Sequence, residues 1–199
     1  MGEVICGISV SVDGFVAGLN MSEQQPLGDM PDEVLHRWMF EEPEKHPEEL
    51  NSIAGTAGAF IMGRNMFGPQ GPSYDASWKG WWGDNPPYHH PVFVLTHRPR
   101  DPIPMEGGTT FYFVTEGIEA ALARAQDAAG DKPVAIAGGA SVVNQYLAIG
   151  AIDDLWLHIA PVTLGHGQRL FEAVPRLQME PIRVGGSALV THIRYRILK

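Results

Sequence analysis

The stretch that decides the fold is Val134-Ala135-Ile136-Ala137-Gly138-Gly139-Ala140-Ser141. Its first half is an apolar run with the length of a short buried strand, and its second half begins a segment that can continue as a helix to about Gly150. Two glycines at such a junction let the main chain turn sharply and leave backbone N–H groups uncovered. The stretch therefore predicts a strand–turn–helix unit, the building block of an α/β fold.

Comparable elements lie on both sides of this unit. Buried strands are predicted at 4–10, 59–62, 92–96, 110–114 and 154–162, and helices at 47–57, at 118–129 and from Pro31 onward. Along 189–198 apolar and polar residues alternate, as in a strand with one exposed face. We therefore expect an α/β fold with a mostly parallel central sheet, helices on both faces and an antiparallel edge near the C-terminus.

We expect a single domain, residues 1–199, with one unusual segment at about 68–91. This segment is rich in proline and glycine and contains Trp78, Trp81 and Trp82. Irregular loops of this length are usually functional or disordered, and the aromatic content favours a packed loop. A packed lid is favoured here over a platform for carbohydrate.

Charge and composition exclude several classes of protein. The chain has 14 Lys and Arg against 23 Asp and Glu, a net charge of −9, which disfavours non-specific binding of nucleic acid. The single cysteine, Cys6, excludes a disulfide framework within the chain and a cysteine-based zinc site. The sequence has no apolar run of membrane-spanning length and no signal-peptide pattern at its start, so we expect a cytoplasmic protein without a membrane partner.

Three predicted strand ends carry groups suited to a nucleotide. Gly138–Ser141 presents bare backbone at a helix start, where phosphates bind; the alternative is a plain turn with Ser141 as helix cap. Gly63-Arg64-Asn65 adds a planar guanidinium, with a solvated arginine as the alternative. Thr96-His97-Arg98 ends the next strand. Together these junctions would form a cationic rim at the carboxyl edge of a parallel sheet, where open α/β sheets bind nucleotides.

We expect no metal site and no serine-hydrolase site. His89 and His90 are adjacent, so they do not converge easily on one ion, and neither a carboxylate nor a third histidine stands at ligand spacing from them. The chain also lacks the Gly-x-Ser-x-Gly pattern of a nucleophile elbow.

Five motifs occur in an order that is characteristic of one family. They are Ser11-Val12-Asp13-Gly14-Phe15-Val16-Ala17, Ile61-Met62-Gly63-Arg64-Asn65-Met66-Phe67, Val94-Leu95-Thr96-His97-Arg98, Ala137-Gly138-Gly139-Ala140-Ser141, and the segment 150–171. The chain thereby resembles the dihydrofolate reductase-like superfamily, in particular the reductase domain of the bifunctional riboflavin-biosynthesis deaminase-reductase and its stand-alone relatives. The motifs span nearly the whole chain.

The resemblance implies an NADPH-dependent reductase. The adenosine-phosphate side of NADPH would bind at Gly63-Arg64-Asn65 and Thr96-His97-Arg98, and the pyrophosphate at Gly138-Gly139-Ala140-Ser141. Val16-Ala17 matches the flexible loop that closes over the nicotinamide, and Ser9 would lie beneath that ring.

The resemblance also implies a substrate cleft between the first strand, the Pro31 helix and the loop after Phe67, with Asp13, Phe67 and Trp82 as candidate substrate residues. Glu33 is the nearest candidate for the acidic group that aids protonation in dihydrofolate reductases. Asp32 is its rival, and an ordinary solvated carboxylate at a helix start is the alternative.

The expected reaction is reduction of a flat heterocycle, either a pyrimidine of the 5-amino-6-ribosylaminouracil type or a pterin-like compound. The alternative is a nucleotide-binding or sensor module on the same fold, without turnover of its own. Because relatives pair through their C-terminal strands and the region of Gly165-His166-Gly167, we also expect a homodimer.

Overall fold

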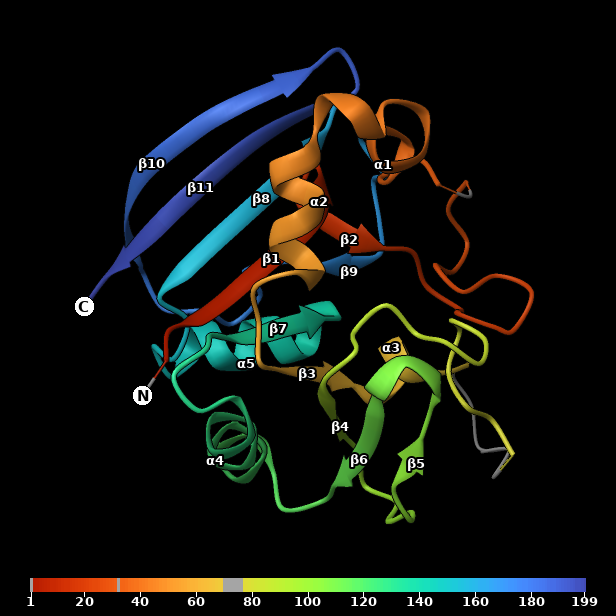
Figure 1. The fold of residues 1–199 in the computed structure, drawn as a ribbon. Helices are drawn as coiled ribbons and strands as arrows, with labels where there is room; N and C mark the ends of the chain where they lie inside the picture. The colour runs from red at the N-terminus through yellow and green to blue at the C-terminus, as the bar shows by residue number, and fades with distance from the viewer. Residues whose placement is uncertain (1, 32, 70–76) are drawn as a thin grey trace.

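The computed structural model describes residues 2–31, 33–69 and 77–199. Within these ranges nine strands form one sheet, in the order β10-β11-β8-β1-β7-β3-β4-β6-β5 (Figure 1). The strands from β8 to β6 are parallel, and β10 and β11 form the antiparallel C-terminal edge. The expected fold class is therefore confirmed.

The elements have the following bounds. The large sheet contains β1 (Val4–Ser11), β3 (Ala59–Gly63), β4 (Pro91–Leu95), β5 (Ile103–Pro104), β6 (Thr110–Val114), β7 (Val134–Gly138), β8 (Asp154–Ala160), β10 (Gln178–Ser187) and β11 (Val190–Leu198). A small sheet pairs β2 (Phe15–Ala17) with β9 (Gln168–Arg169). The helices are α1 (Arg37–Glu41), α2 (Pro47–Ala54), α3 (Arg64–Phe67), α4 (Ile118–Ala129) and α5 (Ala140–Ala148), with short 3-10 turns η1 (Pro43–Lys45) and η2 (Glu106–Gly108).

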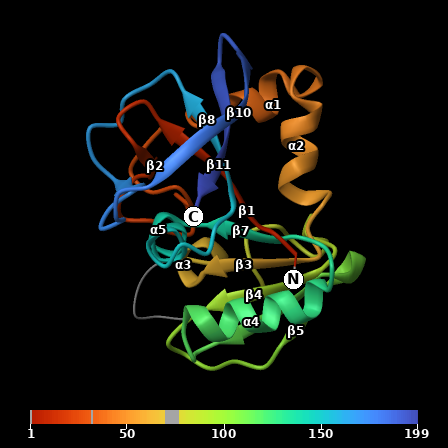
Figure 2. The ribbon, with the colours of Figure 1, turned by 90° about the vertical axis from the view of Figure 1, so that its left-hand side faces the viewer.

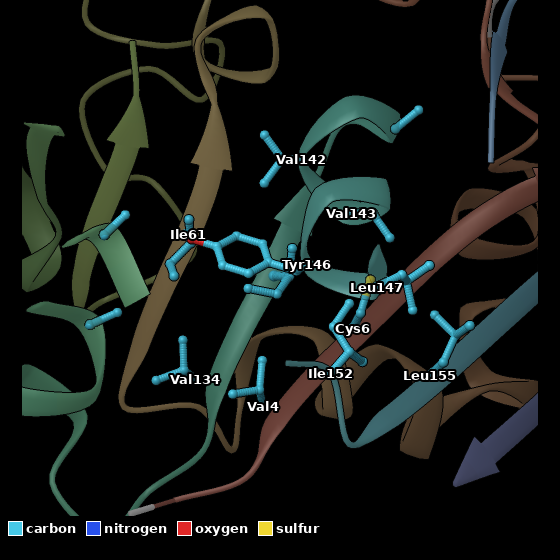
Figure 3. Packing of buried hydrophobic residues seen from close by; sticks show 14 of the residues in the cluster. Val4, Cys6, Ile61, Val134, Val142, Val143, Tyr146, Leu147, Ile152 and Leu155 are labelled. Atoms are coloured by element: carbon cyan, nitrogen blue, oxygen red, sulfur yellow. The ribbon is translucent and has the colours of Figure 1, made fainter. Parts of the chain in front are cut away.

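One face of the sheet is covered by α4 and α5 (Figure 2). The helix α4 places Ala121, Ala125 and Ala129 on one side at helical spacing, and all three are buried. Figure 3 shows the side chains of α5 directed at those of the neighbouring strands, with Tyr146 close to Ile61. This face forms the larger hydrophobic core, and burial within it raises the pKa of the Cys6 thiol to about 12.

The opposite face of β3, β4 and β6 is covered by the aromatic segment. Trp78 and Trp82 pack against a second core cluster, in which the Trp82 ring stacks on Phe111 with 6.1 Å between centroids. The Trp78 Nε1–H donates to the carbonyl oxygen of Phe67 at 2.9 Å. The described part of the segment, residues 68–69 and 77–91, is therefore packed as expected, whereas residues 70–76 of the predicted insertion lie outside the described residues.

The prediction that a helix begins at Pro31 is wrong. Residues 33–36 form a turn, and α1 begins only at Arg37. Glu33 has a φ of 62°, in the left-handed region that a continuous right-handed helix cannot include. The apolar side chains of this region still become buried, since Leu35 and Trp38 are both 0% exposed.

Asp13 fastens the turn between β1 and β2 to a distant loop. Its carboxylate accepts hydrogen bonds from the Ser11 hydroxyl at 2.6 Å, the Leu164 N–H at 3.0 Å and the Gly165 N–H at 2.7 Å. These donors favour the ionised form, and the Ser11 bond is the largest cause that lowers the pKa of Asp13 to about 2. The residue therefore has a structural role in this fold.

We expect replacement of Phe67 to destabilise the protein strongly. Phe67 is 0% exposed between Phe111 and Phe113, so Phe67→Ala would leave a cavity and lower the free energy of unfolding by about 3–5 kcal/mol. Urea denaturation measures this loss. Phe40→Ala is the matched control, because Phe40 is 63% exposed and should change stability by less than about 0.5 kcal/mol. Equal midpoints for the two variants would contradict the packing role.

Asp13 should contribute stability that depends on pH. Because its pKa is lower in the folded chain than its usual value of 3.8, its contribution is fully present above that value and is lost as pH falls toward about 2. The stability difference between the wild type and Asp13→Asn should therefore shrink between these two pH values. Urea midpoints measured across this range check the expectation, and a constant difference would count against it.

Candidate functional site

A pocket of about 430 Å³ lies at the carboxyl ends of β3, β4 and β6, beside the start of α5. Adjacent parallel strands end at the same edge of a sheet, so the segments that follow them meet there. The lining residues are Gly63, Arg64, Asn65, Met66, Pro69, Leu95, Thr96, His97, Arg98, Val114, Thr115, Gly117, Ile118, Gly139, Ser141, Val142, Gln145 and Gln168.

The three junctions singled out in the sequence thus converge on one pocket. All of Gly63-Arg64-Asn65 and Thr96-His97-Arg98 line it, together with Gly139 and Ser141. Gly138 and Ala140 do not line it, and both are buried. The cationic side chains among the described lining residues are those of Arg64 and Arg98, and His97 adds an imidazole.

The two glycines before α5 leave the pocket wall uncovered. Gly138 has a φ of 112°, which side chains rarely tolerate. Gly139 caps α5 with an ordinary φ of −74°, and a Cβ built on it would meet only Gln168 Oε1, at 3.8 Å. The protein therefore leaves open space where the main chain approaches the pocket.

Gly63 is needed for the packing of α5 against β3 and not for the approach of a ligand to the main chain. A Cβ at this position would lie 2.9 Å from Cγ2 of Val142, closer than real Cβ contacts allow. The absence of a side chain at the end of β3 therefore lets α5 pack tightly beside it. This contact brings the start of α5 next to Arg64.

Arg64 and the pair His97 and Arg98 have different surroundings in the pocket. Arg64 donates from Nη1 to the carbonyl oxygens of Gly68 and Pro69, at 2.9 and 2.8 Å, and so holds the beginning of the aromatic segment. Arg98 and His97 are exposed. The Arg98 backbone N–H donates to Thr96 Oγ1 at 3.1 Å, which fixes the turn that follows β4.

Several other expected site residues lie elsewhere. Val16 and Ala17 belong to the buried strand β2 and not to a flexible loop, because Ala17 pairs with Gln168 of β9. Ser9 is buried on β1, opposite His158 of β8. None of these three expected cofactor residues lines the pocket.

The expected substrate residues are engaged within the protein. Phe67 is wholly buried, and the substrate contact expected for it stays a prediction. Trp82 packs on the second core, and Asp13 holds the β1–β2 turn. Glu33 is exposed in the turn before α1, and its rival Asp32 lies outside the described residues. None of the four described residues lines the pocket.

Sequence reasoning missed two amides at the pocket. Gln145 and Gln168 both line it, and the Gln145 Nε2 donates to the Ser141 carbonyl oxygen at 3.1 Å. Gln145 follows Ser141 by one helical turn, a spacing that could have revealed it. Gln168 comes from β9, which reaches the pocket only through tertiary structure.

A second polar group lies on the face of the sheet opposite α5. His158 of β8 and His192 of β11 are register neighbours, and their Nδ1 atoms are 2.8 Å apart. The other ring nitrogen of His192, Nε2, is 2.9 Å from Nδ1 of His46. We call these three side chains the histidine cluster. Burial lowers the pKa of His158 to about 3 and that of His192 to about 4.

The sequence matches one protein family. Residues 3–191 match the model of the RibD C-terminal domain. A Bacillus subtilis protein of uncharacterised function, YwjB, is 34% identical over 83 residues, which cover 40% of this chain and 47% of that protein. The match therefore spans about half the length of this curated relative.

Solved structures show the same fold at low sequence identity. A Shewanella sp. PV-4 protein named for riboflavin biosynthesis superposes with a TM-score of 0.64 at 21% identity, with all of both chains covered. Dihydrofolate reductase from Enterococcus faecalis, solved with NADP(H), superposes with a TM-score of 0.56 at 17% identity, over 98% of this chain and 97% of that one. The expected dihydrofolate reductase-like fold is confirmed. The family match covers nearly the whole chain, and the protein belongs to the RibD C-terminal domain family.

Proposed function

We propose that the protein is an NADPH-dependent reductase of a flat heterocycle of the pyrimidine or pterin type. The observation that carries the proposal is the convergence of three strand ends on one pocket, where cations and the uncovered backbone at the start of α5 face the same space. The family supports a reductase-type activity. The NADP(H)-bound Enterococcus faecalis structure, on the same fold, supports the choice of cofactor.

The residues of the pocket fit the chemistry of a dinucleotide. A diphosphate needs backbone N–H donors, which the beginning of a helix supplies together with its favourable dipole. Gly139 lets such a group approach α5 without meeting a side chain. A 2′-phosphate needs a cation, and Arg98 or His97 would hold it at the opposite side of the pocket.

When bound, NADPH would supply a hydride to a carbon of the substrate. The protein would hold both molecules in a productive orientation and limit the access of water. The role of Glu33 as proton donor stays a prediction, as do the substrate roles of Asp13 and Trp82.

We also retain the homodimer and the cytoplasmic location as proposals. None of the helices that the structure describes is long and apolar enough to cross a bilayer.

An assay of NADPH oxidation distinguishes a reductase from a nucleotide sensor on the same fold. The purified protein is mixed with NADPH and a panel of aminouracil, pterin and dihydropterin compounds, and the loss of the reduced nicotinamide absorbance is followed. A substrate-dependent loss supports the reductase. Tight NADPH binding with no oxidation across the whole panel would favour the sensor.

Arg98 should determine the preference for NADPH over NADH. A charge-assisted hydrogen bond from Arg98 to the 2′-phosphate contributes about 1.5–3 kcal/mol, so Arg98→Ala should weaken NADPH binding by roughly tenfold to a hundredfold. NADH lacks that phosphate and should lose much less affinity. Calorimetric titration of both cofactors measures the two ratios. Arg124→Ala is the control, since Arg124 carries the same charge but does not line the pocket.

Arg64→Ala supplies a comparison. Because Arg64 holds the carbonyl oxygens of Gly68 and Pro69, its loss should weaken both cofactors by disturbing the pocket edge. Equal losses of NADPH and NADH with Arg98→Ala, or no loss with either variant, would remove the proposed 2′-phosphate site.

Gly139→Ala should weaken NADPH and NADH alike without unfolding the protein. The φ of −74° suits alanine and the nearest protein atom to the new Cβ is 3.8 Å away, so the methyl group would occupy space that the diphosphate requires. Cofactor titration together with thermal denaturation checks this expectation. Ser141→Ala is a control that leaves the backbone uncovered and should bind both cofactors much better than Gly139→Ala. Unchanged affinity in Gly139→Ala would place the diphosphate elsewhere.

A further inference from the structure

We propose that His46, Glu49 and His192 form a binding site for a divalent transition-metal ion of the zinc type. One ligand atom from each of these residues lies within 4.8 Å of the other two. The side chains come from the N-terminal side of α2 and from β11, and none of them lines the nucleotide pocket. The site is thus independent of the proposed reductase function.

The burial of these residues separates the site from an ordinary polar surface. His46, Glu49 and His192 are 2%, 5% and 5% exposed, and Trp38 packs its ring against both histidines. Buried charged and polar side chains are normally retained only where they are paired, hydrogen-bonded or bound to a metal. The donor set of two imidazoles and one carboxylate is one that Zn²⁺ commonly takes, with a fourth position left for water.

Three buried polar atoms in or beside the histidine cluster have no hydrogen-bond partner among the described residues. They are Nε2 of His46, Oε2 of Glu42 and Nε2 of His158. A neutral histidine donates from one ring nitrogen and accepts at the other. If the His192 Nε2–H donates to His46 Nδ1, the His46 Nε2–H faces the Glu42 carboxylate at 3.9 Å, which is beyond hydrogen-bond distance.

An ion between His46 and His192 fits the same outer contacts. Both facing nitrogens, His46 Nδ1 and His192 Nε2, then act as ligands, and each ring carries its proton on the outer nitrogen. The His46 Nε2–H points toward Glu42, and the His192 Nδ1–H donates to Nδ1 of His158 at 2.8 Å. Metal-bound histidines are usually oriented in this way, by a carboxylate or another acceptor on the second nitrogen.

The distances require only small movements. Two ligands of a tetrahedral zinc ion stand about 3.3 Å apart, given bonds of about 2.0–2.1 Å to nitrogen. The facing nitrogens of His46 and His192 are 2.9 Å apart, so they must separate slightly. The Glu49 carboxylate must move toward these two nitrogens and give up its ion pair with Arg183, whose Nη2 is 3.5 Å from Glu49 Oε1. Arg183 would keep its second carboxylate partner, Glu48.

The first test is metal content. Full-length protein without an affinity tag is treated with a chelator, dialysed against Zn²⁺ or Co²⁺, and analysed by mass spectrometry of the elements. We expect one tightly held ion per chain and the intense visible spectrum of tetrahedral cobalt, which Zn²⁺ abolishes. A wild-type protein that retains no ion, or a weak octahedral cobalt spectrum, overturns the proposal.

The second test locates the ion. Glu49→Gln keeps the shape but removes the charged ligand. Loss of an outer-shell partner alone costs about 10–100-fold in metal affinity, so this variant should lose at least about tenfold. Glu44→Gln, with the same change of charge at an exposed position nearby, should bind as the wild type does. His192→Gln is the second ligand variant, and circular dichroism confirms that each variant is folded.

Thermal denaturation gives an independent readout. Zn²⁺ should raise the melting temperature of the wild type and of Glu44→Gln but not that of Glu49→Gln, because an ion bound only by the folded chain stabilises it. Equal binding by wild type, Glu49→Gln and His192→Gln overturns the assignment. Loss of binding on replacement of His89 and His90 instead would do the same.

Discussion

The parallel pairing of β7, β3, β4 and β6 is the constraint on which the candidate site depends. In this arrangement Ala59 to Met62 pair with β7 on one side, while Phe60 to Gly63 pair with β4 on the other. The carboxyl ends of the strands are therefore held in line, and the segments after them share one edge. Arg64, Thr96 and Gly139 are far apart in the sequence, yet strand register alone places them around one pocket.

Packing on the two faces of the sheet keeps that edge in position. On one face, Gly63 admits Val142 of α5 closely, so the start of the helix cannot shift away from β3 without opening the core. On the other face, Trp78 donates to the carbonyl of Phe67, just after Arg64. The aromatic segment is thus tied to the end of α3 and packs against the second core cluster.

The strands and turns that depend on neighbouring residues could be predicted from the sequence. Runs such as Val92–Thr96 are apolar and β-branched, and the observed strand Pro91–Leu95 differs from the prediction by one residue at each end. The strand ends could be assigned to a common edge because parallel topology follows from the alternation of strands and helices. Gly138 and Gly139 marked a turn because few other residues suit such a junction.

Two of the failures concern elements formed by distant contacts, and one concerns a local backbone conformation. Val16 and Ala17 became a strand because β9, about 150 positions away, pairs with them. The helix expected from Pro31 was displaced by the left-handed turn at Glu33. His46 and His192 are separated by 146 positions, and no spacing rule connects them. His46 and Glu49 do stand three residues apart at a helix start, but that pattern is common on solvated helices and indicates a ligand pair only once β11 supplies the second imidazole.

The central strand β1 lies between the strands that lead to the pocket and the strands that carry the histidine cluster. On one side it pairs with β7, which leads to Gly139 and the pocket; on the other it pairs with β8, which carries His158. The histidine cluster joins the start of α2 to the antiparallel edge, whereas the pocket residues are held by parallel strands. Although α2 leads into β3, that strand is fixed by neighbours on both sides. Among the described residues the pocket and the set His46, Glu49 and His192 share no side chain, so one sheet supports two separate polar centres.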